Sequence, residues 1–130
     1  MPIVKNPDMA GYEPPPLMKG LLTFKVVGCK PCANGSIMFK HECTESGQFA
    51  GRQVTEFLQT DTSGMKEDWM VERNKARWHE LGEALDFDPT DFDTDTVIGK
   101  DFSASCAPLK NRDGVMEDAI KRYIKAAPAF

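Results

Sequence analysis

Apolar and polar residues alternate over several short stretches of the chain, which is the pattern of a half-buried β-strand. Residues 36–44 show it clearly, with Ile37 and Phe39 on one face and Met38, Lys40 and Glu42 on the other. Asn34-Gly35 and Ser46-Gly47 are turn signals on either side of this stretch. The pattern predicts three strands in the first half of the chain, at residues 21–27, 36–44 and 52–59, with a turn at residues 29–35 between the first two.

A helical period replaces the alternation after residue 60. Trp78, Leu81 and Leu85 fall on one side of a helix predicted for residues 66–85, and we expect them to be its buried stripe. We expect Asp61, Thr62 or Ser63 to cap the start of this helix, and Asp88-Pro89 to end it.

Strand-like segments return after the helix. Residues 100–107 predict a strand with Phe102 inward, and residues 117–125 predict a short strand or helix. The order of strands, one helix and strands again predicts a mainly β fold, namely a small OB-like Greek-key barrel with one inserted α-helix.

Prolines set the first 20 residues apart. Pro2, Pro7 and the run Pro14-Pro15-Pro16 favour extended backbone. We therefore expect a Pro-rich N-terminal arm over residues 1–20 and a single OB-like domain over residues 21–130, a size that suits one domain. The chain has neither a long apolar run nor a signal-peptide core, so we expect a cytoplasmic protein without a membrane partner.

Charge is unevenly distributed along the chain. The net charge is −4, yet residues 83–101 contain seven carboxylates against one lysine, which leaves −6 there and +2 elsewhere. The acidic stretch does not fit an EF-hand loop starting at Asp91, because Thr96 and Phe102 stand where glycine and glutamate are required. We interpret it as a solvated linker. The remainder lacks the strongly basic surface typical of duplex-DNA binding, but it leaves room for a local basic groove.

The four cysteines include the pair Cys29-Lys30-Pro31-Cys32. Two thiolates at this spacing can share a zinc ion or form a redox disulfide. Zinc requires two further ligands, and pairing of the first two strands would place Cys43 at the far end of the hairpin. A redox C-x-x-C normally opens a helix, and this one lies in a turn. We therefore prefer reduced cysteines, and a zinc site on Cys29 and Cys32 remains an alternative.

Motifs of catalysis are missing from the sequence. There is no G-x-S-x-G nucleophile elbow, and the glycines at residues 47–51 lack the lysine and hydroxyl of a phosphate-binding loop. We expect a non-catalytic protein without a cofactor.

Cations and aromatic residues are interleaved on the strand-like segments. Such a mixture suits single-stranded nucleic acid, which lies in a cationic groove with its bases stacked on aromatic side chains. Phe39 and Phe102 are expected in the core. Tyr123, which lies between Arg122 and Lys125, is the better stacking candidate.

Several short motifs resemble those of phage-encoded single-stranded DNA-binding proteins with an OB fold, which belong to recombination and replication modules. They are G-x-x-A-G-R at residues 47–52, a basic-aromatic helix ending in A-L at residues 73–87, V-I-G-K-x-F at residues 97–102, and a D-G turn before residue 123. The resemblance covers about residues 21–123. It implies single-stranded DNA binding in the host cytoplasm, with Tyr123 or Trp69 stacking on bases and with phosphate contacts from Lys40, Arg52, Lys100, Lys110, Arg112 and Arg122.

The chain departs from this family in three places. The C-K-P-C segment and the Pro-rich arm are unusual, and the terminal K-A-A-P-A-F has a phenylalanine, Phe130, without the acidic residues that accompany it in partner-recruiting tails. Two other functions stay open, a phage structural or accessory interaction protein on the same barrel and a small zinc-stabilised binding module. Expected partners are single-stranded DNA, further copies of the chain, and phage recombination or replication proteins.

Overall fold

A computed structural model describes residues 2–11, 13 and 16–125 of the chain. Phe130 and two prolines of the Pro14–Pro16 run lie outside the described residues. The elements are, in order, η1 (Pro7–Met9), β1 (Gly20–Pro31), β2 (Ser36–Cys43), β3 (Gln53–Gln59), α1 (Asp68–Leu85), α2 (Thr94–Val97), β4 (Asp101–Cys106), β5 (Leu109–Lys110), β6 (Met116–Glu117) and β7 (Ile120–Ile124).

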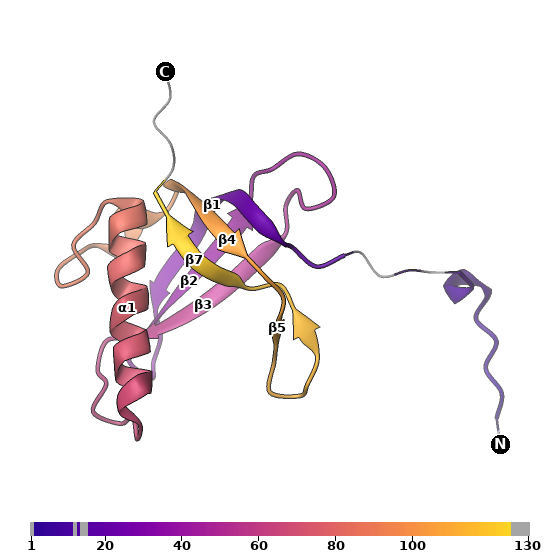
Figure 1. Cartoon of the computed structure of the whole chain (residues 1–130), viewed down its shortest axis with the longest axis horizontal. Coiled ribbons are helices and arrows are strands. Elements are labelled where there is room, and N and C mark those ends of the chain that lie inside the picture. Colours follow the sequence, from indigo (N-terminus) through magenta and orange to yellow (C-terminus); the bar gives the residue numbers. More distant parts are fainter. Residues whose placement is uncertain (1, 12, 14–15, 126–130) are drawn as a thin grey trace.

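The five longer strands form one antiparallel sheet in the order β3-β2-β1-β4-β7. The sheet curls into a half-barrel, and α1, which connects β3 to β4, contacts β3, β4 and β7 (Figure 1). β5 and β6 form a separate small hairpin. The predicted fold class, a small OB-like barrel with one inserted helix, is confirmed.

β1 is the central strand and is shared between two neighbours. Its first half pairs with β4 and its second half with β2, and Phe24 lies opposite both Cys43 and Phe102. The register against β2 shifts between Val26 and Gly28. A bulge of this kind bends a strand and increases its twist, which helps the sheet to curl.

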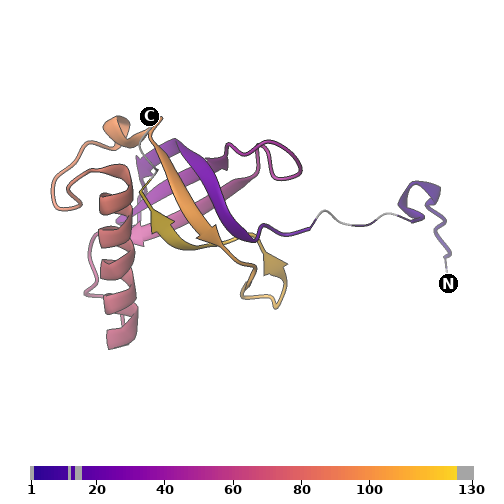
Figure 2. The same cartoon turned by 45° about the horizontal axis from the view of Figure 1, so that its top comes forward.

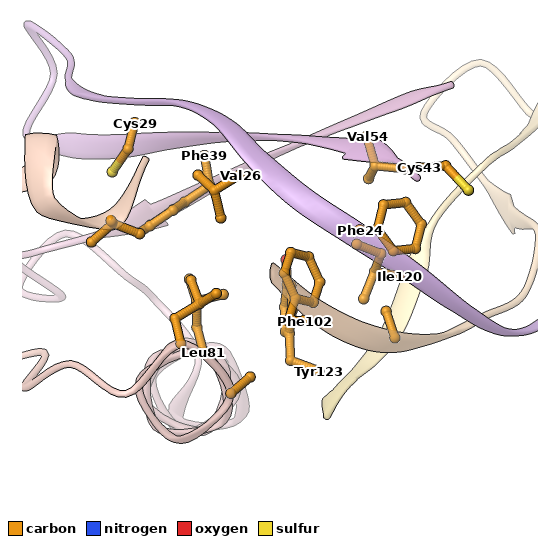
Figure 3. Close-up of a cluster of buried hydrophobic side chains, with 14 of the residues drawn as sticks. Phe24, Val26, Cys29, Phe39, Cys43, Val54, Leu81, Phe102, Ile120 and Tyr123 are labelled. Atoms are coloured by element: carbon orange, nitrogen blue, oxygen red, sulfur yellow. The ribbon is translucent and has the colours of Figure 1, made fainter. Parts of the chain in front are cut away.

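The core fills the inside of the curled sheet beneath α1. Phe24, Phe39, Phe102 and Leu81 are fully buried, and Phe24 stacks on Phe102 with ring centroids 5.6 Å apart (Figure 3). Leu85 is buried as well, and Trp78 packs against this cluster from its edge. The predicted inward faces of the strands and the predicted buried stripe of the helix are therefore confirmed.

Two predicted boundaries are wrong. β1 continues to Pro31, because Cys29 and Pro31 pair with Phe39 and Ile37 of β2, so the turn covers residues 32–35 alone. β4 does not extend alongside this part of β1, so the missing N–H of Pro31 lies where the sheet is not continued.

The helix start also differs from the prediction. It begins at Asp68 with Glu67 in the N-cap position, and Asp61 instead accepts a hydrogen bond from the backbone N–H of Ser63 in the preceding turn. The side chain of Asp61 is thus engaged in local turn geometry.

The N-terminal arm leaves the barrel and extends away from it in both views (Figures 1 and 2). Met18, inside the predicted arm, is fully buried, so the contacts of the barrel begin before β1. The side chains of Ile3 and Val4 are 83% and 87% exposed. Among the described residues, no helix has both the length and the apolar character needed to cross a membrane.

Candidate nucleic-acid interface

The outer face of the β1–β2–β3 sheet carries cations beside apolar side chains. Lys30 lies opposite Met38, and Met38 lies opposite Phe57 on β3. The next row contains Lys40 opposite Thr55. The side chain of Phe57 is 57% exposed, so an aromatic ring stands on this face next to lysines.

A groove of about 370 Å³ continues from this face toward the first half of α1. Phe57 and Trp69 both line it, together with Met65, Met70 and Arg73. Trp69 is 60% exposed. Two solvent-facing aromatic side chains on one groove are the arrangement on which unpaired bases stack. We name this surface, Phe57, Trp69 and Arg73, the aromatic groove.

The position of the aromatic groove depends on the docking of α1 against β3. The Asn74 side chain accepts a hydrogen bond from the backbone N–H of Gln59 (3.0 Å) and donates one to its carbonyl oxygen (2.9 Å). Trp78 Nε1 donates to the same carbonyl at 2.9 Å. These bonds hold the helix to the end of β3 and thereby fix Trp69 relative to Phe57.

A second groove, of about 720 Å³, adjoins the first and shares Phe57 and Arg73 with it. It lies between β3 on one side and residues 107–109 and 117–121 on the other. β3 and β7 are the two ends of the sheet order, so this groove follows the open seam of the half-barrel. We name it the seam groove.

Arg77 of α1 bridges the seam. Its Nε lies 3.1 Å from Oε1 of Glu56 on β3, and its guanidinium donates hydrogen bonds to the carbonyl oxygens of Ile120 and Lys121 on β7. Tyr123 donates its hydroxyl hydrogen to Glu56 and lies beneath the guanidinium, 5.2 Å from it. Side chains therefore tie together two strands that do not pair.

Tyr123 is not a stacking residue, which corrects the prediction made from its cationic neighbours. It is 4% exposed, and its ring packs against Phe102 and His41 in the core. Burial and the adjacent Glu56 carboxylate raise the pKa of Tyr123 well above its usual range. A base cannot reach this ring unless the barrel opens.

Three of the predicted phosphate contacts are engaged within the protein. Arg52 forms an ion pair with Asp118 at 3.2 Å and donates a hydrogen bond to the carbonyl of Pro16. Lys100 donates to the carbonyl of Leu85 at 2.8 Å, at the end of α1. Arg122 pairs with Glu80, although its side chain remains largely exposed. Arg52 and Lys100 therefore have structural roles in this fold.

The remaining predicted residues lie on the surface. Trp69, Lys110 and Arg112 are exposed, and Lys40 is half-buried on the outer face of β2. Among the described residues, Lys40, Lys110, Arg112 and also Arg73 form no ion pair. Lys110 and Arg112 belong to the β5–β6 hairpin, which projects from the barrel (Figure 1).

Sequence reasoning overlooked Phe57 and Arg73 as members of one site. The signal for Phe57 was available, because Val54 and Leu58 point inward and Phe57 therefore points outward on the same strand. The place of Arg73 in the site could not be inferred from the sequence, because only the docking of α1 brings it beside β3.

The cysteines form no ligand set in the described part of the chain. All four are free thiols, and no group of three or more histidine, cysteine or acidic side chains gathers among residues 2–11, 13 and 16–125. Cys29 faces the core while Cys32 lies in the turn, and burial, with a smaller effect of Asp95, raises the pKa of Cys29 to about 11. The zinc alternative therefore lacks the two additional ligands it requires.

His41 is a core residue. It is fully buried, its Nε2 lies 3.3 Å from the Tyr123 hydroxyl, and its Nδ1 has no hydrogen-bond partner among the described residues. Burial, and secondarily Arg77, lowers the pKa of His41 to about 3. It is therefore a neutral ring in the barrel interior at ordinary pH.

Comparisons with known proteins leave the family of the chain open. No protein-family model matches the sequence, and none of the curated proteins matches it either. The geometry of the aromatic groove and the motifs of the sequence are thus the basis for any functional proposal.

Proposed function

We propose that this protein binds single-stranded DNA and has no catalytic activity. The observation that carries the proposal is the aromatic groove, where Phe57 and Trp69 are each more than half exposed and lie beside Arg73, a cation with no ion pair within the described part of the chain. Stacking on an aromatic ring is available to every unpaired base and to none inside an intact duplex. Lys30 and Lys40 on the adjoining sheet face would contact phosphates.

The acidic linker begins far from the aromatic groove. It follows the C-terminal end of α1, whereas Trp69 is the second residue of that helix. A rise of 1.5 Å per residue places Asp86 roughly 25 Å from Trp69 along the helix. That distance exceeds the Debye length of about 8 Å at physiological salt, so the Asp86 carboxylate acts weakly on the aromatic groove. Asp91 lies closer, because the linker turns back along α1 and lines a pocket with Asn74 and Lys75.

The biological setting follows from the motif resemblance. G-x-x-A-G-R and V-I-G-K-x-F support a role in phage DNA replication or recombination, in the cytoplasm of the host. The barrel with one helix between its third and fourth long strands is compatible with that setting.

Fluorescence anisotropy with a labelled oligo-dT tests the proposal. We expect binding at about 50 mM salt that weakens markedly at about 200 mM, because bound cations release counterions from the phosphates. Phe57→Ala and Trp69→Ala should each cost about 1–3 kcal/mol, a loss of roughly 5- to 150-fold in affinity. Ile98→Ala, an exposed apolar residue on the acidic side, is the matched control. Absence of binding at low salt, or affinity equal to wild type in both aromatic variants, would refute the proposal.

A second function, that of an interaction protein on the same barrel, is favoured by the exposed apolar side chains of the arm. A stable oligomer with no affinity for the oligonucleotide would favour this function instead.

A further inference from the structure

The seam groove has the chemistry of a site that accepts an extended peptide. β3 pairs with β2 on one side only, so its other edge presents backbone groups that no strand of the sheet satisfies. Asn74 and Trp78 cover this edge at Gln59 and Arg77 crosses the seam at Glu56, but Val54, Thr55 and Phe57 line the groove. Leu109 supplies an exposed apolar side chain on the opposite wall, next to the buried Ile120. An open edge beside apolar walls is a template for strand addition.

The arm has the complementary chemistry of a strand donor. Ile3 and Val4 are consecutive β-branched residues in non-helical backbone, with more than 80% of each side chain exposed. β-branched residues favour extended strands. The arm is therefore a candidate to add a strand to an open edge.

The arm starts at the rim of the seam groove but leads away from it. Met18 donates its backbone N–H to Asp118, which lines the groove, and Arg52 binds both Asp118 and the carbonyl of Pro16. Beyond this anchor both views show the arm extending outward (Figures 1 and 2). The 14 residues from Ile3 to Pro16 reach at most about 45 Å, which is enough to enter a neighbouring barrel whose radius of gyration is about 13 Å.

We propose that the Ile3-Val4 segment of one copy occupies the seam groove of a second copy and pairs with the open edge of β3. Donor and acceptor are different surfaces of the same chain, so the contact is heterologous and each copy can both give and receive an arm. Copies linked in this way would line up along a DNA strand. That consequence rests on the proposed function, whereas the self-association does not require DNA.

Two variants separate the two halves of the contact. Ile3→Asp combined with Val4→Asp disables the donor, and Leu109→Asp disables the acceptor at an exposed position of the hairpin. Leu21→Asp, at a position that is also exposed but lies outside the groove, is the matched control. Circular dichroism would establish that all of them fold.

Sedimentation velocity over a range of concentrations is the measurement. We expect wild type and Leu21→Asp to self-associate, and each disabled variant alone to associate at least about tenfold more weakly. An equimolar mixture of the two disabled variants should form a one-to-one complex, because each retains the half that the other lacks. Wild type that stays monomeric at all concentrations, a donor variant that associates like wild type, or a mixture that stays monomeric would overturn the inference.

The anisotropy experiment with oligo-dT tests DNA binding separately from self-association. On an oligonucleotide with room for one barrel, and at protein concentrations below those of self-association, the donor variant should bind like wild type, because its aromatic groove is unchanged and no arm then lies beside Phe57 and Arg73, which both grooves share. Loss of self-association with unchanged oligonucleotide affinity assigns the effect to the arm alone.

Discussion

Replacing Arg77 by methionine tests whether side chains hold the open barrel together. Met preserves most of the apolar stem of the arginine but removes the guanidinium that contacts Glu56 on β3 and two carbonyls on β7. Glu56 would then lose its cationic partner in a site where its side chain is only 15% exposed. The structure predicts a large loss of stability from this single change.

The size of the loss follows from that burial. Removing one partner of a buried ion pair costs about 3–5 kcal/mol, whereas an exposed pair is worth about 0–1 kcal/mol. Both side chains of the pair are only 15% exposed, so the cost of removing the Arg77 guanidinium should lie near that of breaking a buried pair. For 130 residues, an unfolding entropy of about 2.1 cal/mol/K per residue converts this to a fall in Tm of roughly 10–18 °C.

Urea denaturation followed by circular dichroism measures the change, and thermal melting checks it. Arg73→Met is the matched control, since Arg73 lies one turn earlier on α1 and forms no ion pair among the described residues; it should change stability by less than about 0.5 kcal/mol. Adding Glu56→Gln to Arg77→Met should recover at least about 1 kcal/mol of stability, because it removes the carboxylate that lost its arginine partner. A loss below about 1 kcal/mol in Arg77→Met would refute the reasoning, because the bridge would then behave as a surface pair.

Three further changes test other parts of the fold. Gly82→Ala should lower Tm, because the new Cβ would stand 2.8 Å from Pro89 Cγ and 2.9 Å from the Phe87 carbonyl oxygen. The cost of overpacking, about 1–3 kcal/mol, should outweigh the gain in helix propensity of about 1 kcal/mol. A higher Tm would contradict this expectation. Asp86→Gly should raise stability by about 0.5–1 kcal/mol, because Asp86 has φ 57° and places a carboxylate at the negative end of α1; an unchanged urea midpoint would contradict this. His41 has its pKa lowered from 6.5 to about 3, so the unfolded chain binds more protons between these values and wild type loses stability as pH falls from 6.5 toward 3. His41→Phe should remove about 1.4 kcal/mol of that loss per pH unit, and equal pH slopes of unfolding free energy in the two proteins would rule this out.

The order of strands and helix was predictable because it depends on local periodicity. Phe39 and Phe102 alternate with polar neighbours, and Leu81 and Leu85 recur at helical spacing, so each face could be assigned without knowing its partner. The barrel class was predictable as well, because few topologies connect such an order of elements compactly.

The site was less predictable because it depends on contacts between distant parts of the chain. Tyr123 was misjudged since the register between β4 and β7 shifts at Ser105/Cys106, which buries Ile120 and Tyr123 although they are three residues apart. Strict alternation would not place both inward. Arg52 was predicted to contact DNA phosphates because its ion-pair partner, Asp118, is 66 residues away in the sequence. Local charge patterns do not show such pairs.

The distribution of the four thiols makes the protein convenient for spectroscopy. Cys29, Cys43 and Cys106 are buried, and their pKa values are raised, to about 11 for Cys29 and Cys106, mainly by burial, so little reactive thiolate forms there. Cys32 is more accessible and lies in the turn whose Gly35 accepts a hydrogen bond from the N–H of Thr60, just after β3. A maleimide dye would therefore react first at Cys32 in the unmodified sequence. That single label would report on the end of the sheet next to the aromatic groove without any engineered cysteine.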